Sequence, residues 1–257
     1  MIPDSHAHLD LIDRDPGEVV SSARAAGVSP IITIGINLDS SGSAVRLAAL
    51  HDTVYAAVGI HPNDTSNLGP EDMEALERLA RSSDRVVAIG ETGLDYYRDR
   101  SPAGTQKKAF REHIRLAGDL GKALVVHDRE AHADTLEILG DEDTGFPVIM
   151  HCFSGDERML AECENRGYYI SFAGPLTFKK SESTRRLASL APLDRLLVET
   201  DSPFLSPEPY RGKPNLPERA RLVAVELAHV RLLLPDEMEA VLADNTARAF
   251  GIQTVRG

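Results

Sequence analysis

Residues 2–10 read Ile-Pro-Asp-Ser-His-Ala-His-Leu-Asp, a short apolar strand whose end carries His6 and His8. Residues two apart on a strand point to the same face, with Cα atoms roughly 6.5–7 Å apart. The two imidazoles can therefore bind one metal ion from the same side, and neutral imidazole is the commonest protein ligand for a transition metal. A lone His-x-His pair fits two incidental histidines equally well, so the rest of the chain has to decide.

Short apolar segments alternate with amphipathic ones along the whole chain. The apolar segments predict eight strands: Ile2–His6, Ile31–Ile36, Val54–Ile60, Val86–Glu91, Ala123–Asp128, Pro147–His151, Tyr168–Phe172 and Leu196–Thr200. The amphipathic segments predict helices that include Pro16–Ala26, Glu71–Arg81, Thr105–Leu120, Glu157–Arg166, Ser181–Leu190 and Pro235–Phe250. Strands that are apolar on both faces and joined by helices form parallel sheets. Because no glycine-rich dinucleotide fingerprint follows the first strand, we expect a closed (β/α)₈ TIM-type barrel rather than a Rossmann sheet.

Length and composition agree with one domain spanning residues 1–257, since 42% of the residues are hydrophobic and 26% are charged. The net charge of −12 argues against a broad surface that neutralises the phosphates of duplex DNA. It does not exclude an enzyme that grips a strand end through bound divalent ions. Two cysteines make no disulfide framework, and we see neither a signal peptide nor a membrane-spanning run. We therefore expect a cytoplasmic protein without an obligate protein partner.

Polar side chains, among them several that can bind metals, recur at the ends of the predicted strands. They are His6, His8, Asn37, His61, Glu91, His127, His151, Ser171, Glu199 and Asp201. In a barrel these strand ends converge on one mouth, where the active sites of this architecture lie. Scattered structural histidines would not select the same end of so many strands. The other four histidines, at positions 51, 113, 132 and 229, fall on predicted helices or loops, and we expect them to be surface or packing residues.

Six of these residues suit a site for two divalent ions: His6, His8, Glu91, His127, His151 and Asp201. We expect the first two histidines and the aspartate to hold one ion, the other two histidines to hold the second, and the glutamate to bridge both. Two ions about 3.5–4 Å apart can activate a water and polarise the bond being cut. Mixed imidazole and carboxylate ligation suits Zn²⁺, Mn²⁺, Fe²⁺ or Ni²⁺ better than Mg²⁺, which favours oxygen ligands.

Longer motifs carry these residues in order along nearly the whole chain. They are Asp4-Ser5-His6-Ala7-His8, Gly59-Ile60-His61-Pro62, Gly90-Glu91-Thr92-Gly93-Leu94-Asp95-Tyr96, His127, His151-Cys152-Phe153-Ser154-Gly155 and Glu199-Thr200-Asp201-Ser202-Pro203. This set resembles the TatD-type metal-dependent deoxyribonucleases of the amidohydrolase superfamily. The resemblance implies a TIM-type barrel and a divalent-metal-dependent phosphodiesterase that digests DNA from 3′ to 5′ at strand ends or on single strands. It also implies the same six metal ligands, and it adds Mg²⁺ to the candidate ions beside Mn²⁺ and Zn²⁺.

Three carboxylates are the predicted catalytic residues: Glu91, Glu199 and Asp201. Asp201 can ligate an ion and also take the proton of the attacking water. Glu199 lies on the same strand face as Asp201, two residues earlier in the chain, so we expect it to orient Asp201 or a histidine. His61 has no place among the six ligands, and we expect it to contact the scissile phosphate rather than to be purely structural.

The loops after the strands should supply the remaining substrate contacts. After the fourth strand, Tyr96 offers a stacking ring and Arg98 a bidentate phosphate fork. Ser154 and the next residue are predicted to begin a helix whose N-terminal amides bind an anion. Cys152 has the opposite strand parity to His151, so we expect a packed thiol facing the helices.

Two alternative functions stay open at this level. A barrel of this kind can hydrolyse another ester or an amide, for example an aminoacyl ester, because fold-level similarity does not fix the substrate. Glu91 on the fourth strand separates this chain from the amidohydrolases that place a modified lysine there. The second alternative is a metal-binding protein without catalytic activity. The complete ligand set and the Glu199–Asp201 pair disfavour it.

Overall fold

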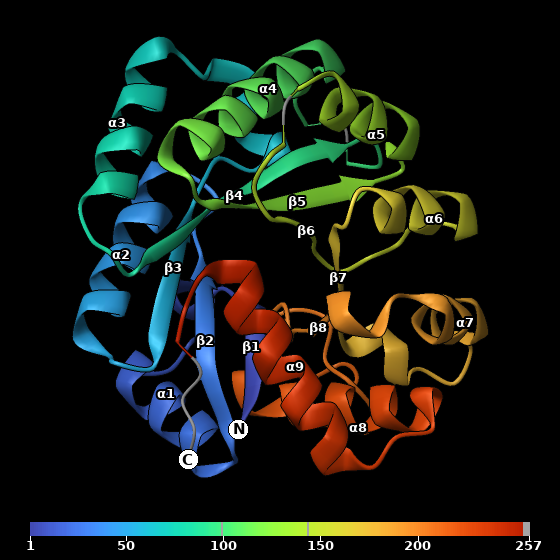
Figure 1. Cartoon of the computed structure of the whole chain (residues 1–257). Coiled ribbons are helices and arrows are strands. Elements are labelled where there is room, and N and C mark those ends of the chain that lie inside the picture. Colours follow the sequence, from blue (N-terminus) through green and yellow to red (C-terminus); the bar gives the residue numbers. More distant parts are fainter. Residues whose placement is uncertain (99, 143, 254–257) are drawn as a thin grey trace.

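The computed structural model describes residues 1–98, 100–142 and 144–253, and its parallel strands follow one another around a barrel (Figure 1). The strands are β1 (Ile2–Ala7), β2 (Val28–Ile34), β3 (Val54–Val58), β4 (Val86–Asp95), β5 (Ala123–Arg129), β6 (Val148–Met150), β7 (Tyr169–Phe172) and β8 (Leu196–Val198). Each strand pairs in parallel with the next one in the chain. The predicted (β/α)₈ barrel is confirmed.

Contacts between the first strand and the segment after β8 close the ring. The backbone N–H of Asp201 donates to the carbonyl of His6 at 2.9 Å. The buried carboxylate of Asp4 accepts hydrogen bonds from the backbone N–H of Thr200 at 2.9 Å and from its hydroxyl at 2.6 Å. These bonds replace a regular β8–β1 ladder, and they bring the two ends of the chain's ligand set together.

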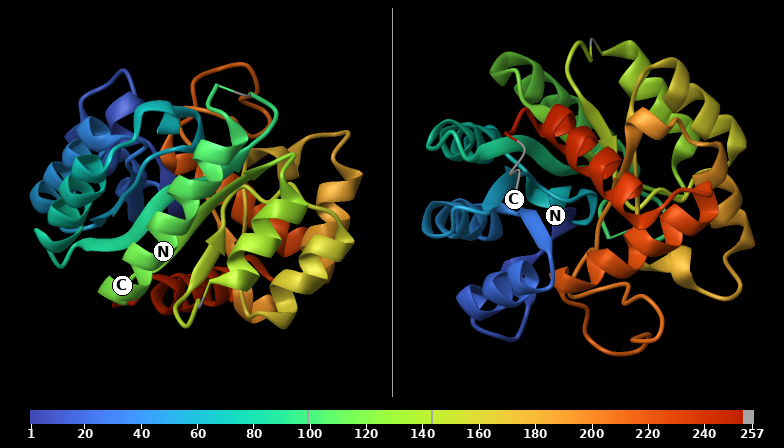
Figure 2. Two further views of the ribbon diagram at one scale, coloured as in Figure 1. Left: turned by 90° about the horizontal axis from the view of Figure 1, so that it is seen from above. Right: turned by 60° about the horizontal axis from the view of Figure 1, so that its bottom comes forward.

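Helices surround the barrel, as both views in Figure 2 show. They are α1 (Pro16–Ala25), α2 (Leu38–Leu50), α3 (Pro70–Arg81), α4 (Ala103–Leu120), α5 (His132–Asp141), α6 (Glu157–Asn165), α7 (Glu182–Leu190), α8 (Ala220–Arg231) and α9 (Pro235–Phe250). Short 3₁₀ helices cover Leu9–Leu11, Pro62–Asn67, Gly174–Thr177, Leu193–Arg195 and Pro217–Arg219. The predicted helices agree with these bounds to within two residues at each end. Gly121 ends α4 at φ +60°, where a side chain would be strained.

The buried apolar residues form two clusters, and the smaller one includes residues at the end of α9. Inside the barrel, Ile32, Val125 and Leu197 pack against Ala249 and Phe250 at the end of α9. The C-terminal helix therefore covers the end where the strands begin (Figure 1). The opposite mouth, where the strands end, is left for the polar strand-end residues.

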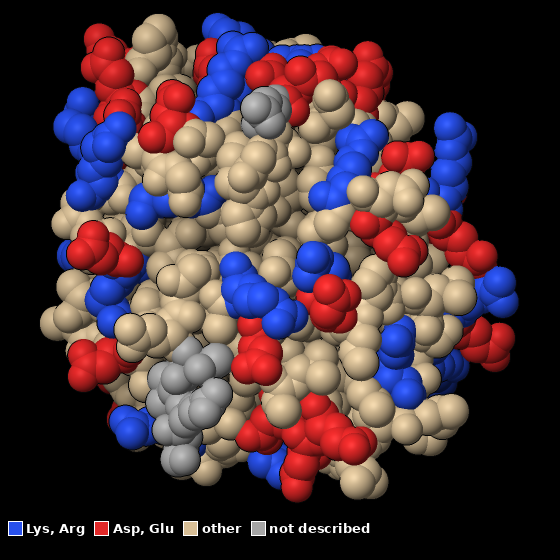
Figure 3. Space-filling view, viewed as in Figure 1, with Lys and Arg blue, Asp and Glu red and all other residues tan. Residues whose placement is uncertain are grey.

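Acidic and basic side chains are interspersed over the face seen in Figure 3, in keeping with a chain that carries 40 acidic and 28 basic residues. None of the helices in the described part of the chain is both long and apolar enough to cross a bilayer.

Candidate metal centre

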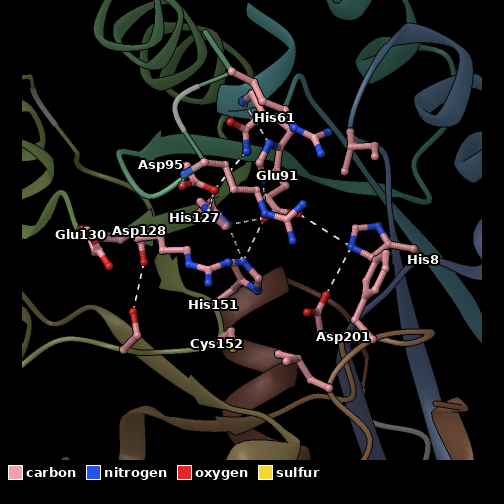
Figure 4. Close-up of a pocket in the computed structure, with 18 of the residues that line it drawn as sticks. His8, His61, Glu91, Asp95, His127, Asp128, Glu130, His151, Cys152 and Asp201 are labelled. Carbon is pink, nitrogen blue, oxygen red and sulfur yellow. Dashed lines mark hydrogen bonds and ion pairs between the residues drawn. The ribbon is translucent and has the colours of Figure 1, made fainter. Parts of the chain in front are cut away.

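The mouth of the barrel holds a cavity of about 810 Å³, within the usual range for ligand sites. Five of the six predicted ligands line it: His8, Glu91, His127, His151 and Asp201 (Figure 4). The sixth, His6, does not line the cavity and is fully buried. The structure therefore brings all six side chains to one place, although they come from positions 6 to 201 of the chain.

Glu91 owes its orientation to an irregularity in β4. The sequence predicts that this strand ends at Glu91, but β4 continues to Asp95. Between Ile89 and Thr92 the pairing with β5 shifts register, so three steps on β4 match two steps on β5. Such a bulge re-aims a side chain, and bulges are common beside active sites. The carboxylate of Glu91 consequently lies among the histidines.

The two oxygens of Glu91 face different histidines. Its Oε1 lies 2.7 Å from Nδ1 of His127 and 2.9 Å from Nε2 of His151. Its Oε2 lies 3.4 Å from Nε2 of His6 and 3.8 Å from Nε2 of His8. This division matches what a carboxylate that bridges two cations needs, one oxygen for each.

The cluster is strongly coupled electrostatically. Burial by itself would raise the pKa of Glu91, but the imidazoles of His151, His127 and His6 hold that pKa well below its ordinary value. Burial would lower the pKa of His151, but Glu91 and Glu199 raise that pKa well above 6.5. A buried carboxylate surrounded by imidazoles stays ionised, and it therefore attracts protons or metal cations to the same place.

Hydrogen bonds on the outer side of the rings of His8 and His151 leave one nitrogen of each for a ligand. Nδ1 of His8 donates to the carbonyl of Ile34 at 3.0 Å, so the lone pair is on Nε2, 3.3 Å from Asp201. Nδ1 of His151 lies 3.2 Å from Glu199, and its Nε2 faces Glu91. Backbone carbonyl and carboxylate partners of this kind are typical of metal-binding histidines. The donor set thus fits divalent ions with mixed nitrogen and oxygen ligation.

Glu199 and Asp201 differ in access. The side chain of Asp201 is 14% exposed, lines the cavity and lies 3.7 Å from Nε2 of His6. Glu199 is fully buried behind His151 and does not line the cavity. It can orient that histidine, but it cannot reach a substrate directly. This position fits the expected role of Glu199 as a residue that orients a histidine, and its part in catalysis stays a prediction.

His61 lines the cavity, and its hydrogen bonds separate it from the other histidines. Its Nδ1 accepts a hydrogen bond from the backbone N–H of Asn63 at 3.0 Å, so the proton of the neutral ring is on Nε2. Nε2 lies 3.7 Å from Oε1 of Glu91. Burial lowers the pKa of His61 to about 4, so the ring is neutral at pH 7. Although His61, Glu91 and His127 are close enough to share an ion, this tautomer offers an N–H donor instead.

Asp95 lines the cavity, but the sequence pattern alone did not predict a role for it at the site. Its Oδ2 lies 3.3 Å from Nε2 of His127 and accepts a hydrogen bond from the side chain of Asn63 at 3.0 Å. Its Oδ1 accepts from the backbone N–H groups of Tyr97 and Arg98. Its place in the motif that contains Glu91 was the available signal, but only the extension of β4 shows that it supports His127.

The predicted substrate residues have different positions. Arg98 lines the cavity. Tyr96 does not: its partly buried ring packs against the core, and its hydroxyl donates to Asp134 of α5 at 2.6 Å. Ser154 lines the cavity but does not begin a helix, because α6 starts at Glu157. The predicted helix start at Ser154 is therefore wrong, and the carboxylate of Asp156 caps α6 by accepting a hydrogen bond from the backbone N–H of Met159 at 2.8 Å.

Two expectations about other side chains need correction. Cys152 has φ +42°, which breaks the strand alternation, and the half-buried thiol lines the cavity instead of packing under the helices. His132 also lines the cavity, with Nδ1 2.5 Å from the carboxylate of Asp128. Asn37, at the predicted end of the second strand, caps α2 by accepting a hydrogen bond from the backbone N–H of Ser40.

Comparisons with known proteins agree with the geometry. Residues 3–251 match the family described as "TatD related DNase". A Bacillus subtilis protein called "Uncharacterized metal-dependent hydrolase YabD" is 38% identical over 98% of this chain and 100% of its own length. The Citrobacter koseri protein called "3'-5' ssDNA/RNA exonuclease TatD" is 36% identical over 93% of this chain and 94% of its own length.

A solved structure, described as YJJV, a TatD homolog from Escherichia coli K12, superposes with a TM-score of 0.92. It is 28% identical and covers 98% of each chain. The family match spans nearly all of the barrel, including every residue of the six-donor cluster. The chain therefore belongs to the TatD family of metal-dependent hydrolases.

Proposed function

We propose that this protein hydrolyses phosphodiester bonds of DNA from a 3′ end, with two divalent ions at the mouth of the barrel. The observation that carries the proposal is the division of Glu91, whose two oxygens face two separate sets of histidines. Relatives named as 3′-to-5′ exonucleases on single-stranded DNA and RNA support the choice of a nucleic acid as substrate.

The chain would hold one ion with His6, His8 and Asp201, whose ligand atoms lie within 4.8 Å of one another. His127 and His151 would hold the second ion, and Glu91 would bridge the two. When bound, a pair of divalent ions lowers the pKa of water and offsets the charge that develops on the phosphate. Mg²⁺, Mn²⁺ and Zn²⁺ are the ions to test, because oxygen and imidazole donors are both present.

The other residues would act on the water and the phosphate. Asp201 reaches the cavity, and burial would raise its pKa, but the neighbouring imidazoles of His8 and His6 lower it. The carboxylate is therefore ionised and can accept the proton of the attacking water. His61 is neutral and presents its Nε2–H, so it can donate to a phosphate oxygen. Arg98 on the rim can take a neighbouring phosphate through its guanidinium fork.

A panel of substrates tests the proposal. Single-stranded DNA labelled at its 5′ end should give a ladder of shortening products with Mn²⁺ or Mg²⁺ and nothing in chelator. Duplex DNA, RNA and an aminoacyl ester complete the panel, and faster hydrolysis of the ester than of DNA would contradict the proposal. His127→Ala should remove nearly all activity while its circular dichroism stays unchanged. His229→Ala, at an exposed position on α8, is the matched control and should keep full activity.

A further inference from the structure

An exposed apolar wall borders the cavity beside the metal centre. Phe204 and Leu205 both line the cavity, and they leave 52% and 37% of their surfaces exposed. Pro175 lines it as well. Contiguous exposed apolar side chains can mark ligand-binding grooves, and ligand pockets are lined largely by apolar and aromatic side chains. The metal ligands and the phosphate-binding residues proposed above do not include any residue of this wall, so its function is still unexplained.

The loop that carries the wall is held in one conformation. The backbone N–H of the buried Asn215 donates to the carbonyl of Pro203 at 2.9 Å. Leu205 has φ +50°, which a residue with a side chain adopts only where its surroundings enforce it. Its carbonyl lies against Gly174, where a Cβ atom would be 1.8 Å from that oxygen. The packing of this loop therefore holds Phe204 in position before a ligand binds. Such preorganisation lowers the entropic cost of binding.

Phe204 lies at the same side of the site as one set of metal ligands. Its ring centre is 6.0 Å from that of His8, in an edge-to-face arrangement. Figure 4 shows His8 and Asp201 on one side of the cavity, and Asp128 and Glu130 on the other. A group that contacts Phe204 is therefore next to the predicted position of the scissile phosphate.

The cationic side chains of the cavity come from other loops. Arg98 and Arg100 follow β4, and Arg129 ends β5, beside the acidic Asp128 and Glu130. The guanidinium of Arg129 stacks on the ring of Tyr97, 4.0 Å from its centre, which fixes its position. A ligand in this cavity can thus contact both cations and an aromatic ring. A nucleotide has this combination of parts, because its phosphates are anionic and its base has a flat apolar face.

We infer that the base of the terminal nucleotide stacks on Phe204 while the preceding phosphates of the strand lie toward Arg98, Arg100 and Arg129. The inference rests on the nuclease function proposed above, and it names the part of the enzyme that recognises the end of the strand. The side chains of Phe204, Leu205 and Pro175 offer no hydrogen bonds to base edges. All four bases should therefore be accepted, with purines favoured because they stack over a larger area.

The first experiment compares two single-stranded oligonucleotides that differ only at the 3′ end, one with a complete nucleotide and one with a tetrahydrofuran abasic residue. Phe204→Ala should lower kcat/KM for the complete substrate about 10-fold and leave the abasic substrate unchanged. Phe204→Leu should give an intermediate loss, because it keeps apolar contact without a ring. An equal loss on both substrates, or no loss on either, would overturn the inference.

Leu190→Ala is the matched control, because Leu190 is 51% exposed and ends α7. The C-terminal ends of barrel helices lie away from the mouth where the strands end, so this variant should leave both rates unchanged.

The second experiment measures binding without turnover. The chain has no tryptophan, so the fluorescence of 2-aminopurine deoxynucleoside monophosphate can be followed without protein background. With Mg²⁺, wild-type enzyme should quench this probe by stacking, and Phe204→Ala should abolish the quenching. If Phe204 is needed for quenching but the wild-type enzyme cleaves no DNA, the inferred base-stacking site is supported and the proposed reaction is rejected. Cleavage of DNA with quenching unaffected by Phe204→Ala would reject the base site alone.

Discussion

His113 on α4 should make the stability of this protein depend on pH in a defined way. The ring is fully buried, its Nε2 accepts a hydrogen bond from the backbone N–H of Ile60 at 3.1 Å, and its Nδ1 donates to the carbonyl of Ala109 at 2.7 Å. Burial lowers the pKa of His113 from its ordinary value of 6.5 to about 4. Ile60, which donates to His113, directly precedes His61 in the chain. His113 therefore also holds the backbone next to a residue of the metal centre.

The sign and size of this effect on the free energy of unfolding follow from proton binding at His113. Between pH 6.5 and pH 4 the unfolded chain binds a proton at His113 and the folded chain does not, so stability falls as the pH falls through this window. Integration over the two pKa values gives a loss of about 2 kcal/mol between pH 7.5 and pH 5 from this one group. Below pH 4 the folded state also takes up the proton, and the contribution stops changing.

Urea unfolding followed by circular dichroism, in chelator, measures this contribution as a difference between variants. His113→Gln keeps an acceptor for Ile60 but does not titrate, so it should be less stable than wild type at pH 7.5. The gap should narrow by about 2 kcal/mol at pH 5. His113→Asn should show the same narrowing whatever its absolute stability, because both variants lose the same titration. A gap that stays constant between the two pH values would refute a buried neutral imidazole.

Three further changes test the site. Asp95→Asn should weaken Mn²⁺ binding in titration calorimetry by about 10- to 100-fold, because His127 loses its supporting carboxylate, and an unchanged affinity would exclude that role. Arg98→Ala should raise KM for a nucleotide substrate more than for a generic phosphodiester, and equal effects would count against a phosphate clamp. Gly93→Ala should lower stability to urea by at least about 2 kcal/mol, since Gly93 has φ +131° and the new Cβ would be 2.1 Å from the carbonyl oxygen of His127. Unfolding at the wild-type urea concentration would contradict that clash.

Much of the fold could be predicted because it depends on local patterns. The period of apolar residues distinguishes strands from helices, and α9 begins and ends at the predicted residues, Pro235 and Phe250. Strand ends were less certain, because hydrogen bonds between strands decide where pairing stops. β4 shows this most clearly, since pairing with β5 carries it four residues past Glu91.

Side-chain direction in the loops was the part that the sequence could not supply. Alternation along a strand predicts a face only while the backbone stays extended, and Cys152 departs from it with a positive φ. Tyr96 belongs to a metal-site motif, but the carboxylate of Asp134 on α5 draws its hydroxyl away from the cavity. Asp95 and Phe204 gained their roles only when segments distant in the sequence came together.

The sequence by itself determined an alternating α/β chain and the chemical identity of six metal-competent side chains, because both follow from residue type and short spacing. The tertiary structure decided how those side chains face one another. Closure of β1 against the segment after β8 places His6 beside Asp201, and the bulge in β4 turns Glu91 toward both sets of histidines. The physical reason is that these distances are fixed by pairing between strands far apart in the chain, which no local pattern records.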